Sequence, residues 1–236
     1  MTSITATVTP GTTPPSVTLV TDWTGVTTFE RIQDGVSTPV RGTAVWADSE
    51  WTLLDFECPQ ETPVTYRYAG VTSALVEMPD VGVWLIPPGR PEFAAQLNMA
   101  EYPEWLRPIQ ESVTDIPGRP NSVVVQTARR GSRRGSLKVW ARNLDLFATL
   151  DACLEVTGPK LLSSPVRHHP LEQRGLWVTV GDVGETFPGV QGVPIWLLTL
   201  PLTRVDRPEV VAIEAGHRIM DEVGTWLEAT GLLGDP

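Results

Sequence analysis

Short runs of alternating apolar and polar residues, separated by glycine and proline, recur along the chain. Residues 136–142 display this pattern clearly, with apolar side chains at every second position. A period of two is expected of a strand that has one buried face. The 20 glycines and 22 prolines are too many for a mostly helical protein, so the composition agrees with the pattern. The sequence therefore predicts a mainly β fold of the β-rich α+β class.

The first part of the chain, residues 1–78, is predicted to form a small antiparallel β-sandwich. Its alternating runs are short and have the spacing of sandwich strands: 4–8, 17–21, 27–32, 51–56 and 64–68. Asp34 and Gly35 predict a hairpin with a type I′ turn, which requires positive φ at both positions. Tyr66 and Tyr68 fall on one strand face, where a hydroxyl can hydrogen-bond while its ring packs. The segment resembles a fibronectin type III or immunoglobulin-like module.

Residues 79–236 are expected to form a second β-rich domain with two helices. Its strands are predicted at 123–127, 136–142, 159–164, 176–180 and 195–205. An internal helix is predicted over 143–155, because apolar residues three to four apart follow Asn143, a favourable N-cap residue. A C-terminal helix is predicted over 209–231 from an apolar stripe that consists of Ile219, Val223, Trp226 and Leu227.

The segment 83–121 contains seven prolines, which predicts little regular structure. A structureless loop of this length is unusual inside a compact domain unless it binds something. We therefore interpret the segment as an arm. Phe93, Leu97 and Trp105 are its apolar anchors, and two packing partners are open for them: a neighbouring subunit or the protein's own core.

The strands at 123–127 and 136–142 are expected to pair as a basic hairpin over 122–142. Between residues 116 and 144 there are seven cations and no carboxylate, although the whole chain has a net charge of −10. The turn holds four of these cations: Arg129, Arg130, Arg133 and Arg134. Such a tip can meet an acidic surface of another copy or of a partner. The alternatives are a solvated loop tip and a phosphate-binding tip. The acidic composition and the lack of aromatic residues at the tip disfavour the last, so no specific nucleic-acid partner is expected.

The sequence contains no recognisable catalytic constellation. His168 and His169 are adjacent, so on a strand they would point to opposite faces, whereas a metal site needs convergent ligands. Nucleophile-elbow, Walker-loop and dinucleotide motifs do not occur in the context that they require. Cys58 and Cys153 lie far apart and are expected to be separate buried thiols. We therefore assign no catalytic, cofactor-binding or metal-binding residue and expect a protein that is not an enzyme.

A membrane-spanning helix needs an apolar run of roughly 20 residues. The sequence has no run that approaches this length, so membrane insertion is not expected. The N-terminus lacks both the basic segment and the apolar core of a signal peptide, which predicts synthesis as a cytosolic protein.

Four segments follow one another in the chain: TVTPGTTPPSVTL, TTFERIQDGVSTPVRG, LLDFECPQETPVTYRY and SVVVQTARRGSRRGSLKVWARNLDLFATLDACL, the last followed by GPKLLSSP. In this order they resemble the minor tail proteins of long-tailed actinobacterial phages, especially the distal tail protein type. The resemblance implies a β-sandwich joined to a split-barrel-like β domain with helices. It also implies a structural virion protein of the tail tip or baseplate, which forms a ring between the tail tube and the tip complex.

On this resemblance the partners would be other copies of the chain in a hexameric or trimeric ring, the tail tube protein, and the tail tip (hub) and tape measure proteins. The location would be the virion, after assembly in the host cytoplasm. The residues expected between subunits are Arg129, Arg130, Arg133 and Arg134 of the hairpin and Phe93 and Trp105 of the arm. A ring of identical subunits needs contacts between two different faces, and a basic tip against an acidic flank suits them.

Two other classes of function stay open. A carbohydrate or cell-surface binding module would use exposed aromatic rings, among them Trp46, Trp51 or Trp105, as stacking platforms. A hydrolase would need clustered ionisable groups, and the separation of two carboxylates cannot be read from a sequence. Binding of glycans by a monomer would favour the module, whereas loss of activity on replacing His168 or His169 would favour the hydrolase.

Overall fold

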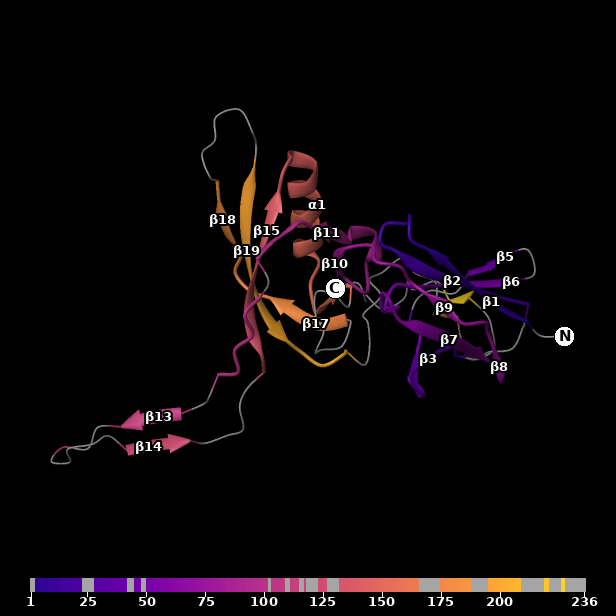
Figure 1. The fold of residues 1–236 in the computed structure, drawn as a ribbon, viewed down its shortest axis with the longest axis horizontal. Coiled ribbons are helices and arrows are strands. Elements are labelled where there is room, and N and C mark those ends of the chain that lie inside the picture. Colours follow the sequence, from indigo (N-terminus) through magenta and orange to yellow (C-terminus); the bar gives the residue numbers. More distant parts are fainter. Residues whose placement is uncertain are drawn as a thin grey trace, which may run out of the picture.

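The computed structural model describes residues 3–22, 28–41, 45–47, 50–101, 103–108, 111–114, 117, 123–126, 132–165, 175–187, 195–208, 219–220 and 226–227. These residues form a mainly β protein that contains one α-helix (Figure 1), which confirms the predicted fold class. The helix has 12 residues, and the described part of the chain holds no helix long and apolar enough to cross a membrane.

Two antiparallel sheets built from residues 4–77 pack face to face as a sandwich. One has the strand order β1-β2-β6-β5, and the other has the order β4-β3-β7-β8, with β9 also paired to β7. Val17, Leu19 and Tyr66 are almost fully buried between them. The strands are β1 (Ile4–Thr9), β2 (Ser16–Thr21), β3 (Glu30–Gln33), β4 (Val36–Pro39), β5 (Val45–Ala47), β6 (Glu50–Asp55), β7 (Pro63–Tyr68), β8 (Val71–Thr72) and β9 (Val76–Glu77).

The local signals in this part of the sequence are confirmed. In β6 and β7 every second residue is buried, as a period of two requires. Gln33 pairs with Val36, so Asp34 and Gly35 alone form the turn, and their φ angles of 49° and 77° are those of a type I′ hairpin. The hydroxyl of the buried Tyr66 donates a hydrogen bond of 2.9 Å to Asp55 Oδ2.

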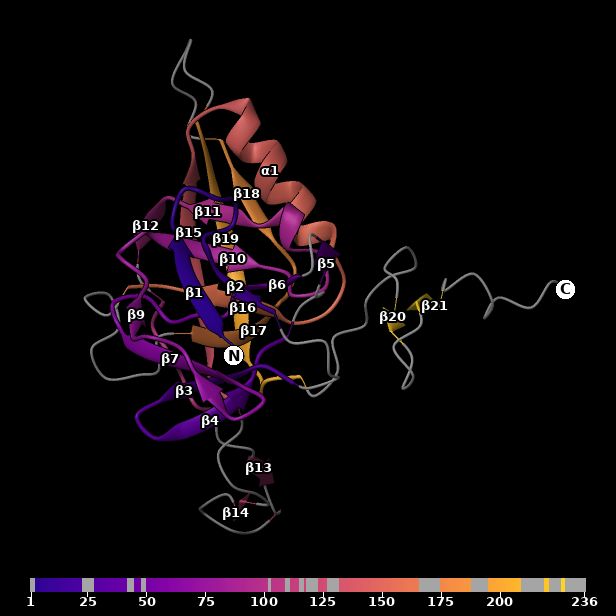
Figure 2. The ribbon, with the colours of Figure 1, turned by 90° about the vertical axis from the view of Figure 1, so that its right-hand side faces the viewer.

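The main sheet has the order β11-β10-β16-β17-β19-β15-β12, with β18 also paired to β19. All its neighbouring strands are antiparallel. They are β10 (Val83–Ile86), β11 (Ala95–Leu97), β12 (Met99–Glu101), β15 (Arg134–Ala141), β16 (Lys160–Ser163), β17 (Gly175–Val180), β18 (Gly184–Thr186) and β19 (Trp196–Arg204). The sheet is strongly curled, as Figures 1 and 2 show.

The two ends of the main sheet are joined by one stretch of chain. The strands at its ends, β11 and β12, are separated only by Asn98. β11 pairs with β10, and β12 pairs with β15, where Trp140 N donates a hydrogen bond of 2.8 Å to Asn98 O. Because the segment 95–101 pairs first at one end and then at the other, the sheet is held in a barrel-like curl around its apolar interior.

Helix α1 (Leu144–Glu155) covers part of this interior. The side chain of Asn143 accepts a hydrogen bond of 2.8 Å from Leu146 N, which confirms the predicted N-cap. Leu150 and Cys153 are the buried residues of the helix. They join a core cluster with alternate residues of the strands, among which Leu137, Val139, Leu198, Leu200 and Leu202 are at most 2% exposed.

The prediction that 83–121 has little regular structure is wrong. The segment supplies β10, β11, β12, β13 (Glu111–Thr114) and the 3-10 helix η1 (Pro91–Phe93). The prolines in the described part of the segment lie between these strands or, as Pro91 does, at the first position of a helical turn. Proline removes a backbone donor only at its own position, so it separates short strands without abolishing them.

The predicted pairing of the basic hairpin 122–142 is also wrong. Both strands exist, but β14 (Val123–Gln126) pairs with β13, whereas β15 pairs with β12 and β19. A period of two identifies a strand and its faces but contains no information on its partner. Strands β13 and β14, which we call the arm, project away from the main sheet in both views (Figures 1 and 2).

The C-terminal helix predicted over 209–231 is contradicted at the four residues of this segment that the structure describes. Ile219–Met220 (β20) and Trp226–Leu227 (β21) are two short strands that pair in antiparallel register. β-branched and aromatic side chains favour strands, and cross-strand pairing brings the same apolar residues together as the helical stripe would have done. The other residues of the segment lie outside the described part.

Charged and polar side chains connect the sandwich to the main sheet. Glu57 forms salt bridges of 2.6 Å with Arg41 and 2.7 Å with Arg207. The Arg41 guanidinium lies 4.9 Å from the centre of the Trp177 ring, in cation–π geometry. Gln60 Nε2 lies 3.0 Å from Ser163 Oγ in β16. These contacts join segments more than 100 residues apart in sequence.

Candidate assembly surface at the base of the arm

The chain that leads into the arm is fixed against the beginning of β15. Leu106 and Arg134 exchange two backbone hydrogen bonds, of 2.7 and 2.8 Å, and form an isolated antiparallel bridge. Arg134 is also opposite Thr203 in β19. Three segments, around residues 106, 134 and 203, therefore run side by side at the base of the arm.

Trp105 packs into this base against a glycine. A Cβ atom at Gly135 would lie 3.1 Å from Glu104 O and 3.2 Å from Trp105 Cε3, so the close approach of the two segments depends on the absence of a side chain there. Trp105 packs against the main core cluster. Its indole Nε1 is buried and has no hydrogen-bond acceptor among the described residues. Trp105 thus closes one end of the protein's own core.

Three arginines form a row across the same three segments. Since Leu106 is opposite Arg134 and Arg134 is opposite Thr203, the next position outward aligns Arg107, Arg133 and Arg204. Arg204 N donates a hydrogen bond of 2.8 Å to Arg133 O, which confirms the alignment. Directly opposite residues of neighbouring strands lie on one face. We call Arg107, Arg133 and Arg204 the arginine row.

The arginine row continues the inner face of the curled sheet. In β15 the odd-numbered residues Leu137 and Val139 are buried, and alternation places Arg133 on their face and Arg134 on the opposite one. Partial desolvation and the neighbouring charges of Arg107 and Arg204 lower the pKa of the Arg133 guanidinium. Like charges directly opposite each other destabilise a sheet. The row is therefore electrostatically unfavourable within a single subunit.

The structure separates the residues that the sequence grouped as one interface. Arg133 and Arg134 lie at the base of the arm but on opposite faces, and Arg129 and Arg130 lie outside the described residues. Phe93 lies in η1, which contacts α1, and the Arg90 guanidinium is 4.6 Å from its ring centre. Leu97 is 7% exposed and belongs to the same core as Trp105. For these two anchors, the open question between neighbour and own core is answered mainly by the own core.

Arg107 and Arg204 are members of the row that sequence reasoning missed. Their positions are 26 and 71 residues from Arg133, and only the register of the strands brings them together. Leu106, whose side chain is 69% exposed, lies beside the row and was not singled out either.

Exposed aromatic residues gather at another place on the main sheet. Phe187 is 55% exposed, and its ring centre is 5.8 Å from that of Trp196, which is 5.1 Å from that of Phe147. Trp51, by contrast, is only 8% exposed and offers no stacking platform. The side chain of Trp46 lies outside the described part. The aromatic group thus differs from the one that the sequence proposed for sugar binding.

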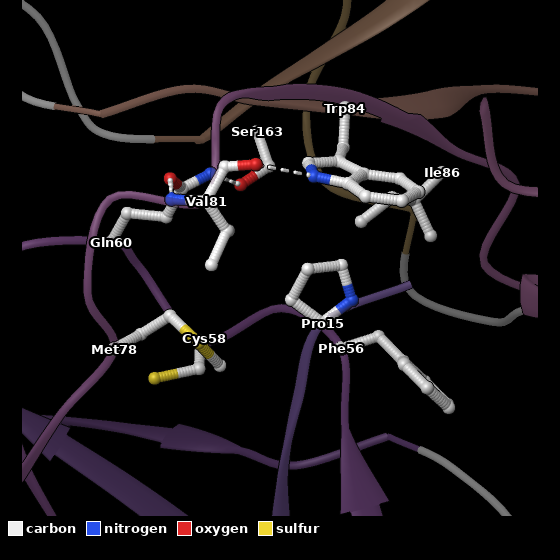
Figure 3. A pocket seen from close by; sticks show the side chains of 9 residues that line it. All are labelled: Pro15, Phe56, Cys58, Gln60, Met78, Val81, Trp84, Ile86 and Ser163. Atoms are coloured by element: carbon white, nitrogen blue, oxygen red, sulfur yellow. Dashed lines mark hydrogen bonds between the residues drawn. The ribbon is translucent and has the colours of Figure 1, made fainter. Parts of the chain in front are cut away.

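Two hollows were examined as possible ligand sites. A cavity of about 10 Å³ between the sandwich and the main sheet (Figure 3) has room for no more than one water molecule. A groove of about 390 Å³ follows β11 and β12. Its carboxylate, Glu101, forms a salt bridge of 2.9 Å with Lys138. Among the described residues no group of three or more His, Cys, Asp and Glu side chains could hold a metal ion, and all three histidines fall outside them.

Comparison with known proteins gave no match to any protein-family model and none to any curated sequence. The geometry at the base of the arm, together with the order of segments in the chain, is therefore what a functional inference must start from.

Proposed function

We propose that the chain is a structural virion protein of a phage tail tip, of the distal tail protein type. Copies of it form a closed ring, hexameric or trimeric, that joins the tail tube to the tip complex or baseplate. Its partners are then other copies of itself, the tail tube protein, and the hub and tape measure proteins. It acts in the virion after assembly in the host cytoplasm, and it has no enzymatic step.

The observation that supports this proposal most is the arm. β13 and β14 pair with each other through four residues each and, among the described residues, with no third strand. An isolated two-stranded ribbon is marginally stable in water, and its two outer edges present unpaired backbone groups. A ribbon that projects from a folded body is therefore well suited to pack against another subunit, which would stabilise it.

The distribution of charge also supports contacts between unlike faces. The chain has a net charge of −10, yet the base of the arm gathers Arg107, Arg133, Arg134 and Arg204. Complementary patches guide association and fix register. A ring of identical subunits requires such head-to-tail contacts, whereas a two-fold dimer pairs each face with itself.

Native mass spectrometry of the full chain at several concentrations, in moderate salt, tests the ring. We expect one discrete oligomer, a hexamer or a trimer, whose mass does not grow with concentration because a ring is closed. Negative-stain electron microscopy should show annular particles of one size. A strict monomer at every concentration, or open-ended fibres, would contradict the self-assembling ring.

A carbohydrate or cell-surface binding module is the second candidate, and the exposed group of Phe187, Trp196 and Phe147 favours it. Aromatic rings that are open to solvent can stack against the apolar faces of sugars. On this alternative a monomer should bind immobilised glycans, and Phe187→Ala should remove the binding. The matched control is Leu75→Ala, which shortens an equally exposed apolar side chain, 66% exposed, in the sandwich. Equal loss in both variants would speak against a specific platform.

A further inference from the structure

The exposed face of α1 carries negative charge only. Asp145, Asp151 and Glu155 are exposed, and the last turn of the helix contains no basic residue. In the described part of the chain, none of the three carboxylates forms a salt bridge. We call these three residues the acidic face of α1.

The acidic face of α1 is electrostatically unfavourable in an isolated subunit. Asp151 and Glu155 are four residues apart, so two like charges are neighbours on the helix surface. Glu155 is the last residue of α1, at the negative end of the helix dipole, where a cation would be favoured. The arginine row has the same character with the opposite sign. Local interactions that oppose stability are expected mainly at functional sites.

The two surfaces cannot meet within one subunit. The arginine row lies beyond the first residue of β15, and α1 begins three residues after the last. An eight-residue strand spans roughly 25 Å. Figures 1 and 2 both show α1 and the arm at opposite ends of the main sheet. Each surface is therefore available to a partner.

We propose that the arginine row of one copy binds the acidic face of α1 on a second copy. Guanidinium groups pair well with carboxylates, and three of each are presented. The contact joins two different faces, so repetition around an axis gives a ring. The inference rests on the proposed function, because it needs self-assembly, and it adds which two faces meet.

Charge reversal tests this contact. One variant combines Arg133→Glu with Arg204→Glu, and another combines Asp151→Lys with Glu155→Lys. Each should weaken assembly of the full chain by about 10- to 100-fold in dissociation constant, because attraction becomes repulsion. The chain that carries all four substitutions should assemble again, to within about threefold of the unaltered protein, because the charges are exchanged and still complementary. The readouts are native mass spectrometry and light scattering.

Two matched controls separate this contact from general charge effects. Arg134→Glu changes the neighbouring residue on the opposite face of β15, and Asp182→Lys with Glu185→Lys reverses two exposed carboxylates near β18. Both should leave assembly unchanged. Arg107→Glu tests the row at an exposed position if the double arginine variant does not fold, which circular dichroism will detect.

The outcomes distinguish this inference from the ring itself. If the unaltered chain forms a closed oligomer and the reversals do not weaken it, the row–helix contact is refuted and the ring stands. The same holds if the fourfold variant fails to recover while it is folded. If the unaltered chain is a strict monomer at every concentration, the contact is refuted together with the self-assembling ring.

Discussion

Replacing Asp55 with alanine is expected to lower the free energy of unfolding by about 3–5 kcal/mol. The carboxylate is fully buried in the sandwich and lies 2.7 Å from Arg31 Nη1. It also accepts hydrogen bonds of 2.9 Å from the Tyr66 hydroxyl and from Glu57 N. Burial acts to lower the pKa of Arg31, but the charge and hydrogen bonds of Asp55 outweigh it and raise that pKa. The alanine variant would leave a buried charge and two polar groups without their partner, which is why a large loss is expected.

The control for this prediction is Glu30→Ala, which removes another arginine–carboxylate pair between β3 and β7. That pair, with Arg67, is exposed, with side chains 36% and 44% accessible, and solvent screens it. Urea denaturation of both variants at pH 7 gives the comparison. A loss with Asp55→Ala no larger than with Glu30→Ala would contradict the structural role of the buried pair. Replacing both buried partners, Arg31→Met with Asp55→Leu, should recover most of the stability.

Raising the pH from 9 to 11 is expected to destabilise the protein by about 4 kcal/mol through its two cysteines. Burial, together with the charge of Asp55, raises the pKa of Cys58 to about 12, and burial raises the pKa of Cys153 to about 11. In the unfolded chain a thiol ionises near pH 8.5. A raised pKa in the fold means that its contribution is complete below that pH. The contribution is lost as pH rises, by about 1.4 kcal/mol per pH unit for each thiol.

Urea denaturation in steps from pH 8 to pH 11, with a reducing agent, measures this loss. Cys58→Ala should destabilise the protein at pH 8, because it leaves a small cavity beside Met78, but should reduce the slope against pH to roughly half. Tyr66 adds to the remaining slope above about pH 10, since burial raises its pKa as well. An unchanged slope in Cys58→Ala would show that this thiol ionises as easily in the fold as in the unfolded chain.

Local elements of this fold could be predicted because their causes are local. Asp34 and Gly35 form the predicted turn, since their own φ angles determine it. Asn143 caps α1 through a hydrogen bond to a residue three positions later. Strand pairing has no such local cause: β14 could have joined β15, but it pairs with β13 instead. A period of two is identical in both arrangements, so the sequence pattern could not decide between them.

The candidate site was predictable only in part for the same reason. The density of arginines before β15 correctly directed attention to Arg133 and Arg134. The alternation that places them on opposite faces follows from β15 itself, but Arg107 and Arg204 join Arg133 only through the register of two other segments. Trp105 could not be assigned to the core from sequence, because its place depends on Gly135, 30 residues later. Residues assembled by tertiary register leave no spacing that a sequence can reveal.

The stretch 95–101, which joins both ends of the main sheet, also sets an order of events during synthesis. Its first half can pair with β10 as soon as it is made, but its second half waits for β15, some 40 residues later. The sheet is complete only when β19 has emerged, and pairings between such distant segments form slowly. Arg204, at the end of β19, completes the arginine row at the same moment. A nascent chain therefore lacks that contact surface, and only subunits that have finished folding can use it.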